Sequence, residues 1–229
     1  MLSPISIHGL FITATDTEVG KTVVGGAIAD WFRRRRFRVG VCKPMASGCI
    51  HAREGLVSED AEFLAHQADA PGPLDLICPQ RFSEPLTPAI AAERAGQKID
   101  WNAIQSALKR IESESDVMIV EGVGGIMVPI EGQRTVLDWM TALDIPVLLV
   151  VGGYLGTISH TLTALDVLAQ RKLTIAAIIV SEGDRDTVEL DDTVASIARF
   201  AGHTGVVGLP RLPAGIKHHP AIARVAALL

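Results

Sequence analysis

The stretch TATDTEVGKT, residues 13–22, lies between an apolar run, ISIHGLFI (5–12), and a helical stretch, VVGGAIADWFRRRR (23–36). It ends in Gly-Lys-Thr, as phosphate-binding loops do, and it has the strand–loop–helix setting that such a loop requires. The generic loop has a glycine five residues before Gly20, where this chain has Thr15. Two interpretations are open at this point: a nucleotide site with unusual spacing, or a turn that ends in GKT by chance.

Short apolar segments alternate with longer amphipathic ones along the chain. The short segments are rich in Val and Ile, which is typical of strands buried on both faces. We expect strands at 7–14, 38–44, 116–122, 146–152, 174–180 and 205–209, and helices at 21–35, 59–68, 99–113, 135–143, 158–171, 190–201 and 219–228. This order predicts a P-loop NTPase-like α/β fold, with a mostly parallel sheet and helices on both faces. The least regular part, 48–99, is expected either to form a wall of a site or to be a surface region.

Composition narrows the functional class. The 229 residues, expected to form one domain (1–229), are 48% hydrophobic and 21% charged, which is a globular balance. A net charge of −5 and 4% aromatic residues argue against a nucleic-acid partner. Three cysteines without CxxC spacing favour a reducing compartment. No signal peptide is evident and no apolar run reaches the roughly 20 residues of a membrane helix, so we expect a soluble cytoplasmic protein with no membrane partner.

The loop itself suggests chemistry for two side chains. Free N–H groups and the dipole at a helix N-terminus favour bound phosphates. Lys21 would contact the β- and γ-phosphates, and the Thr22 hydroxyl could ligate Mg²⁺. In DVMIVEGVGG (116–125), Glu121 ends a predicted strand, where a carboxylate beside a phosphate loop is placed to hold the same ion. A solvated glutamate in a surface turn is the alternative for Glu121.

Two further charged residues are candidates. Lys43, in VCKPMASG (41–48), comes at the end of an apolar strand and faces either solvent or a site, where it would bind an anion. Asp60, in VSEDAEFL (57–64), lies in the first turn of a predicted helix, and helix capping alone would explain it. Because ligands bind at the carboxyl ends of parallel strands, we expect the chemistry at that edge of the sheet.

Taken together, the motifs resemble those of the dethiobiotin synthase family. They occur in the order TATDTEVGKT, CKPMASG, SEDA, EPLTPAIAAE, VEGVGG, VVGGYLGTISH and GLPRL, and cover roughly residues 9–212. The resemblance implies an ATP- and Mg²⁺-dependent enzyme of biotin synthesis that converts 7,8-diaminononanoate and CO₂ to dethiobiotin, through a carbamate and a carbamic–phosphoric anhydride. In this family the loop is one residue longer, and its first glycine falls at Ala14. Ala14 therefore either has ordinary backbone angles or strains the loop.

The resemblance also implies roles for individual residues. Lys21 would follow the charge on the transferred phosphoryl group, Lys43 would hold the carbamate, and Thr22, Asp60 and Glu121 would hold Mg²⁺. The nucleotide-binding set is Glu18, Val19, Gly20, Lys21, Thr22, Val23, Asp60, Glu121, Gly122, Val123, Gly124, Ser181, Glu182, Pro210, Arg211 and Leu212. The substrate-binding set is Thr17, Lys43, Ser47 and, from a second subunit, Gly156, Thr157 and Ser159. The implied assembly is a homodimer with shared active sites.

Two positions depart from the family pattern. Ser159 stands where asparagine is expected, so one hydrogen bond to the substrate carboxylate is lost or rerouted. Ser181 stands where an asparagine usually contacts the purine, and serine reaches less far with fewer hydrogen-bonding groups. Selectivity for ATP is therefore expected to be looser.

Three other functions fit the sequence less well. Partitioning-type ATPases share the fold class, but they carry a second lysine five residues before the loop lysine, where this chain has Asp16. Cobyrinate-amidating ligases need a glutaminase domain, for which 229 residues leave no room. A purely binding role would not explain why Lys43, Asp60 and Glu121 are all expected at one loop.

Overall fold

The computed structural model describes residues 8–70, 72–184, 188–211 and 219–229. Its centre is a six-stranded parallel sheet in the order β12-β11-β10-β1-β7-β2. The strands are β1 (Leu10–Ala14), β2 (Val39–Cys42), β7 (Val117–Glu121), β10 (Val147–Gly152), β11 (Ile175–Ser181) and β12 (Gly205–Leu209). Each overlaps a strand expected from the sequence, so the predicted parallel α/β sheet is confirmed.

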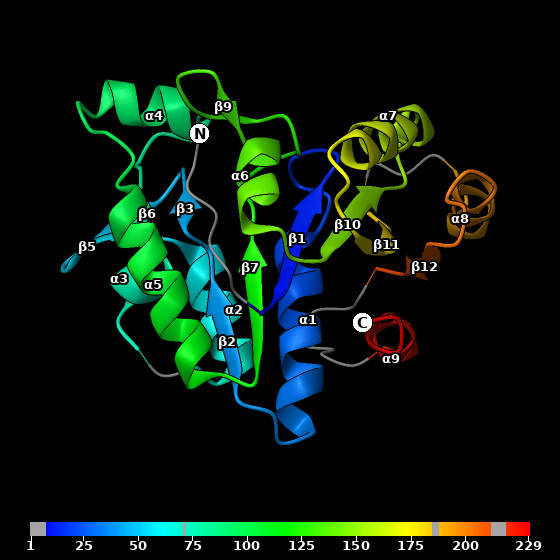
Figure 1. The fold of residues 1–229 in the computed structure, drawn as a ribbon, viewed down its shortest axis with the longest axis horizontal. Coiled ribbons are helices and arrows are strands. Elements are labelled where there is room, and N and C mark those ends of the chain that lie inside the picture. Colours follow the sequence, from blue (N-terminus) through cyan, green and yellow to red (C-terminus); the bar gives the residue numbers. More distant parts are fainter. Residues whose placement is uncertain (1–7, 71, 185–187, 212–218) are drawn as a thin grey trace.

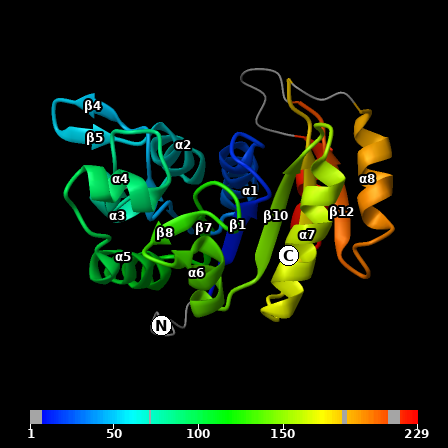
Figure 2. The ribbon, with the colours of Figure 1, turned by 90° about the horizontal axis from the view of Figure 1, so that it is seen from above.

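Helices cover both faces of this sheet (Figures 1 and 2). One face packs against α1 (Lys21–Arg34), α2 (Glu59–Ala68), α3 (Leu74–Ile77) and α9 (Pro220–Ala226). The other packs against α4 (Pro88–Arg94), α5 (Trp101–Glu114), α6 (Val136–Leu143), α7 (Thr157–Gln170) and α8 (Leu190–Ala198). No helix within the described ranges combines the length and apolar character needed to cross a membrane.

Strand β1 shows why the strand segments are almost continuously apolar. Its residues are fully buried and alternate between the two cores: Phe11 packs on one face and Ile12 on the other. On the first face Phe11 meets Trp139 of α6 edge-on, with the ring centroids 5.0 Å apart. Burial on both faces leaves the carboxyl edge of the sheet as the place where polar side chains can gather.

The segment expected to be irregular carries short elements of its own. Within 48–99 these are β4 (Ile50–Ala52), β5 (Gly55–Val57) and β6 (Gln80–Arg81). Strand β3 (Met45–Ala46) comes just before this segment, and β8 (Pro129–Glu131) and β9 (Arg134–Thr135) follow β7. Strands β3 and β6 pair in parallel, and β4 and β5 form an antiparallel hairpin. The hairpin is largely exposed, whereas β3 is buried and leads directly to Ser47. Within 48–99, the hairpin fits the expectation of a surface region, while the start of α2, which carries Asp60, is the part placed to form a wall of a site.

Candidate active site

The loop between β1 and α1 has the backbone of a phosphate-binding loop, and Ala14, at the position where the family has glycine, is the residue whose backbone angles were in question. Gly20, the residue before α1, has φ 94°, and Glu18 is in the left-handed region at φ 60°. A Cβ atom at Gly20 would lie 2.7 Å from Ser181 Oγ and would be strained by the positive φ, so the position favours glycine. Ala14 belongs to β1, is fully buried and has no positive φ. The longer loop therefore starts without strain at Ala14.

Lys21 is folded back against its own loop. Its Nζ donates a hydrogen bond to the backbone oxygen of Asp16 at 3.1 Å, and the residue is only 7% exposed. Burial lowers the pKa of Lys21 to about 8; the positive charge of Lys43 acts in the same direction, and Glu121 opposes it. The side chain is thus positioned over the loop, with a titration close to neutral pH.

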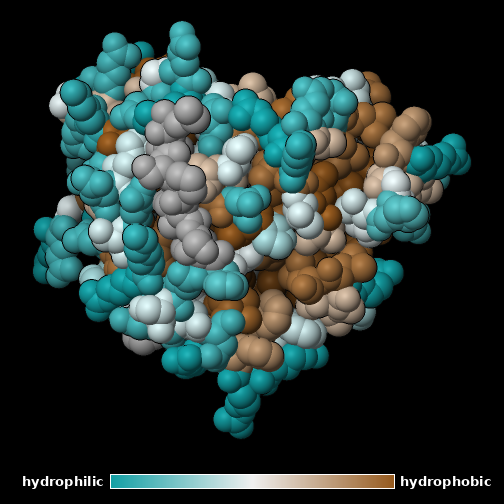
Figure 3. Space-filling model, viewed as in Figure 1, coloured by the Kyte–Doolittle hydropathy of each residue, from teal (hydrophilic) through white to brown (hydrophobic). Residues whose placement is uncertain are grey.

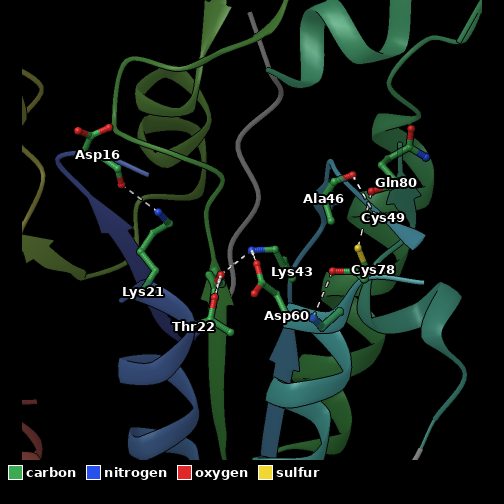
Figure 4. A network of polar contacts seen from close by, with 12 residues as sticks. Asp16, Lys21, Thr22, Lys43, Ala46, Cys49, Asp60, Cys78 and Gln80 are labelled. Carbon is green, nitrogen blue, oxygen red and sulfur yellow. Dashed lines mark hydrogen bonds and ion pairs between the residues drawn. The ribbon is translucent and has the colours of Figure 1, made fainter. Parts of the chain in front are cut away.

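A buried ion cluster lies beside the loop (Figure 4). Lys43 Nζ is 2.5 Å from Glu121 Oε1 and 2.9 Å from Asp60 Oδ2, and Thr22 Oγ1 donates to Glu121 Oε1 at 2.8 Å. Burial disfavours the charged form of Lys43, but the two carboxylates outweigh it and raise the pKa of that ammonium. The structure therefore brings together Thr22 of α1, Lys43 directly after β2, Asp60 of α2 and Glu121 of β7.

Helix capping does not account for Asp60. The cap of α2 is Ser58, whose Oγ accepts from the backbone N–H of Ala61 at 3.3 Å. The Asp60 side chain is 52% exposed and turns toward Lys43. Burial alone would raise the pKa of Asp60, but Lys43 and Thr22 outweigh burial and lower it. Asp60 is therefore an ionised carboxylate at the mouth of the cluster.

The oxygen atoms here fit a magnesium ion. A threonine hydroxyl and two carboxylates are donors that Mg²⁺ accepts, usually together with water and phosphate oxygens. Glu121 Oε2 is buried and has no hydrogen-bond partner within the described part of the chain. No group of three or more His, Cys, Asp or Glu side chains in the described ranges is placed to hold a metal, so Mg²⁺ would need Thr22 and ligand oxygens as well.

Two adjoining hollows surround the loop. The inner hollow, about 340 Å³, is lined by Thr17, Glu18, Gly20, Lys21, Thr22, Val23, Lys43, Ala46, Ser47, Asp60, Glu121, Val123 and Gly124. The outer hollow, about 650 Å³, is lined by Asp16, Thr17, Glu18, Val19, Gly20, Val23, Gly152, Tyr154, Ser181, Glu182, Gly183, Asp184, Leu209, Pro210 and Arg211. The loop separates them: its residues Thr17, Glu18 and Gly20, with Val23 of α1, line both hollows.

Most of the sequence-derived site residues fall in one hollow or the other. The inner one collects the residues implied for phosphate, Mg²⁺ and near-substrate contacts, and the outer one those implied for the base. Gly122 is different: its N–H donates to Ile12 O at 2.9 Å, and a Cβ atom there would lie 2.9 Å from Phe11. The Gly122 N–H is therefore already paired within the protein, and a nucleotide contact of this residue stays a prediction. Leu212 lies outside the described residues.

The wall of the outer hollow is formed by the ends of β11 and β12. Ser181 turns its Oγ toward Gly20, as described above. The backbone N–H of Arg211 donates to Glu182 Oε2 at 2.9 Å, and the Arg211 guanidinium forms an ion pair with Asp184. Two of the residues implied for base binding thus contact each other.

The residues implied for the substrate carboxylate lie elsewhere, at the start of α7. Thr157 is 2% exposed and donates its Oγ1 to Gly152 O at 2.7 Å, while Gly156 and Ser159 are exposed. None of the three lines either hollow of its own chain. Their contribution from a second subunit remains a prediction.

Sequence reasoning assigned no role to Tyr154 or to the backbone of Asp16. Tyr154 lines the outer hollow and Asp16 O holds Lys21. A signal existed for Tyr154, which is the only tyrosine of the chain and lies within the motif VVGGYLGTISH. The backbone contact of Asp16 had no such signal.

A parallel α/β sheet with a GKT loop after β1 and a carboxylate at the end of the adjacent strand defines the class of P-loop nucleotide-binding proteins. A family model described as an AAA domain matches residues 8–218. Over 200 residues the chain is 40% identical to the ATP-dependent dethiobiotin synthetase BioD of Acidiphilium cryptum, covering 85% of this chain and 88% of that protein. The chain belongs to the ATP-dependent dethiobiotin synthetase family.

A second relative and a solved structure extend this comparison. The BioD protein of Ralstonia nicotianae is 36% identical over 205 residues, 89% of each chain. The cell division ATPase MinD of Pyrococcus furiosus superposes with a TM-score of 0.54, covering 96% of this chain and 97% of MinD, at 13% identity. At that identity the likeness to MinD shows the fold alone.

Proposed function

We propose that the protein catalyses the ATP-dependent carboxylation and cyclisation of 7,8-diaminononanoate with CO₂, releasing dethiobiotin, ADP and phosphate in biotin biosynthesis. The observation that carries this proposal is the inner hollow, where the ammonium groups of Lys21 and Lys43 line one space beside the carboxylates of Asp60 and Glu121. One 229-residue domain is enough for this chemistry, because no glutaminase step is needed.

The two lysines would act at different stages. One amine of the substrate captures CO₂ as a carbamate, and Lys43, whose pKa is raised, holds that anion as a permanently charged partner. The carbamate oxygen then attacks the γ-phosphorus, ADP leaves, and Lys21 neutralises charge on the transferred group. The second amine attacks the carbonyl of the mixed anhydride, phosphate leaves, and the ureido ring closes.

Other residues would hold the reactants. Thr22, Asp60 and Glu121 would hold Mg²⁺, which would supply charge neutralisation at the β- and γ-phosphate oxygens. The remaining loop residues, Glu18 to Val23, would surround the phosphates through backbone N–H groups. Ser181, Glu182, Pro210 and Arg211 would line the base, and Thr17 and Ser47 would contact the substrate near its amines.

We infer a homodimer in which the start of α7 serves the partner's substrate. The first turn of a helix presents N–H groups that no intrahelical carbonyl reaches, which suits a carboxylate. Leu155, next to Gly156, is 83% exposed, as expected for a residue that a partner covers. Figure 3 supports this, because apolar surface gathers over the half of that face that carries α7, while the half that carries α5 is mostly hydrophilic.

The first experiment is release of ADP by purified protein with Mg²⁺-ATP and bicarbonate, with and without 7,8-diaminononanoate, alongside detection of dethiobiotin by mass. We expect diamine-dependent ADP, an equal amount of dethiobiotin, and loss of both with EDTA or in Lys43→Ala. If ADP is released at the same rate without the diamine, the protein is a P-loop ATPase and the proposed reaction is wrong.

The homodimer is tested by mixing two inactive variants, Lys43→Ala and Ser159→Trp. The mixture should recover part of the activity, since each hybrid dimer keeps one intact shared site.

A further inference from the structure

Tyr154 lies between the outer hollow and the first turn of α7. Its ring lines the hollow and packs so closely on Gly152 that a Cβ atom there would come within 2.8 Å of Tyr154 Cδ1. Its hydroxyl is 3.0 Å from His160 Nδ1, and the two rings are 5.8 Å apart between centroids. The side chain is thus held at its base by backbone and at its tip by a residue of α7.

His160 connects this contact to the segment assigned above to the substrate carboxylate. Its backbone N–H donates to Gly156 O at 3.1 Å, and its Cε1 lies 3.9 Å from where a Cβ atom at Gly156 would be. The N–H of Thr157 in turn donates to Tyr154 O at 3.1 Å. The turn that begins α7 is therefore held by Tyr154 on its N-terminal side and by His160 on its C-terminal side.

Tyr154 also lies near the start of the phosphate loop, because Asp16 and Tyr154 line the same hollow. Burial raises the pKa of Tyr154, with Thr15 opposing and the Asp16 carboxylate adding to the rise. The hydroxyl therefore keeps its proton at neutral pH and can donate it. The same loop is tied to the neighbouring strand, because the N–H of Thr15 donates to Val150 O at 3.2 Å. One side chain thus contacts the nucleotide hollow and the first turn of α7.

We propose that Tyr154 and His160 are positioning residues that couple nucleotide binding in the outer hollow of one subunit to binding, at the first turn of its α7, of the carboxylate of the substrate in the partner's site. A bound nucleotide fixes the Tyr154 ring, the phenol fixes His160, and His160 fixes the turn from Tyr154 to Thr157. This rests on the proposed function, since it takes that turn as part of the substrate site. Such coupling is a free energy shared by two sites, so each ligand must strengthen the other by the same factor.

The first test uses the single tyrosine of the chain. Protein that contains 3-fluorotyrosine has one ¹⁹F resonance, from Tyr154. We expect it to shift on addition of Mg²⁺-ADP and to shift again on addition of 7,8-diaminononanoate. An unchanged resonance at saturating Mg²⁺-ADP would overturn the proposal whatever the catalytic assay gives, because the ring would then not sense the nucleotide.

The second test measures the coupling by calorimetry, from the dissociation constant of Mg²⁺-ADP with and without the diamine. In the wild type we expect the diamine to tighten ADP about fivefold or more, a common size for such coupling. Tyr154→Phe keeps the ring and loses the hydroxyl, and His160→Ala loses the partner, so in both the factor should fall toward one. His160→Asn, whose amide can replace Nδ1, should recover part of it, and Gln170→Ala at the far end of α7 should leave it unchanged.

The outcomes separate this inference from the proposed function. Absence of coupling in the wild type, or undiminished coupling in Tyr154→Phe, would overturn the inference even if dethiobiotin is formed. If no dethiobiotin is formed while the resonance responds to Mg²⁺-ADP alone, the function fails and the substrate arm of the inference fails with it. A loss of folding in His160→Ala would be visible by circular dichroism, and Tyr154→Phe then decides the question.

Discussion

Lys43 and Glu121 meet at 2.5 Å although 78 residues separate them in the sequence. The parallel register explains the contact: Cys42 of β2 pairs with Val120 of β7, so the next residue of each strand emerges side by side at the same edge. Their side chains are 6% and 0% exposed, which places both charges largely out of water. Asp60 is a second partner of Lys43, at 2.9 Å, whereas removing Lys43 would leave the buried Glu121 carboxylate without its closest positive charge.

The first prediction concerns this pair. Lys43→Met removes the ammonium and leaves a buried carboxylate, so we expect the free energy of unfolding to fall by roughly 3–5 kcal/mol. The double variant Lys43→Met/Glu121→Gln removes both charges and should recover most of that loss, while dethiobiotin formation stays absent in both. Urea unfolding at pH 7.5 measures the difference. Equal stability of the single and double variants would show that the pair is not coupled.

The second prediction follows from the lowered pKa of Lys21, about 8. Phosphate binding requires the charged ammonium, so the affinity for Mg²⁺-ADP should fall as pH rises from 7.5 to 9.5, approaching about tenfold per pH unit above that pKa. Arginine stays charged over this range. In Lys21→Arg the affinity should therefore depend much less on pH, even if it is weaker throughout. If the affinity fell equally steeply with pH in both proteins, the pH dependence would not come from the titration of Lys21.

The same titration predicts a change in stability of defined sign. Below about pH 8 Lys21 carries its proton in both folded and unfolded chains. Between about pH 8 and the usual value of 10.5, the unfolded chain binds more protons than the folded one, so the Lys21 contribution to the free energy of unfolding rises with pH. Relative to Lys21→Met, the wild type should gain stability from pH 8 to pH 10. Thermal unfolding at several pH values measures this, and a constant difference would argue against the shift.

The strands and the edge of the sheet that carries the site could be predicted from the sequence, because both depend on local pattern and on strand order. Buried strands have an apolar signature, and charged residues such as Lys43 and Glu121 that follow parallel strands must gather at one edge. Contacts that depend on a particular tertiary neighbour could not be predicted. The Gly122 N–H is paired with Ile12 O, and Tyr154 with His160, and neither partner is marked in the sequence. Asp60 was ambiguous because Ser58, two residues away, caps the same helix.

The fourth prediction concerns Ala14 and Gly20, because the sequence alone did not decide whether Ala14 strains the loop. Ala14 pairs with Val150 as ordinary strand backbone, so Ala14→Gly should lower the free energy of unfolding by about 1 kcal/mol and leave the ADP affinity unchanged. Gly20→Ala forces a left-handed backbone angle at a cost of about 1–2 kcal/mol and brings a methyl group against Ser181. We expect it to weaken ADP binding about tenfold. The reverse ranking in a binding titration would mean that the strain lies at Ala14.

The fifth prediction concerns selectivity for the base. Ser181 lines the outer hollow, and its Oγ lies 2.7 Å from where a Cβ atom at Gly20 would be. Its short side chain carries one hydroxyl, so we expect it to offer the purine little discrimination. Ser181→Asn adds a donor and an acceptor on a longer side chain at the same wall. A hydrogen bond of about 1 kcal/mol that only one base can satisfy should raise the ratio of kcat/KM for ATP over GTP roughly fivefold. Ser181→Ala serves as the matched control and should leave the ratio near that of the wild type. If Ser181→Ala lowers the ratio as much as Ser181→Asn raises it, the serine already contacts the base, and selectivity is not loosened at this position.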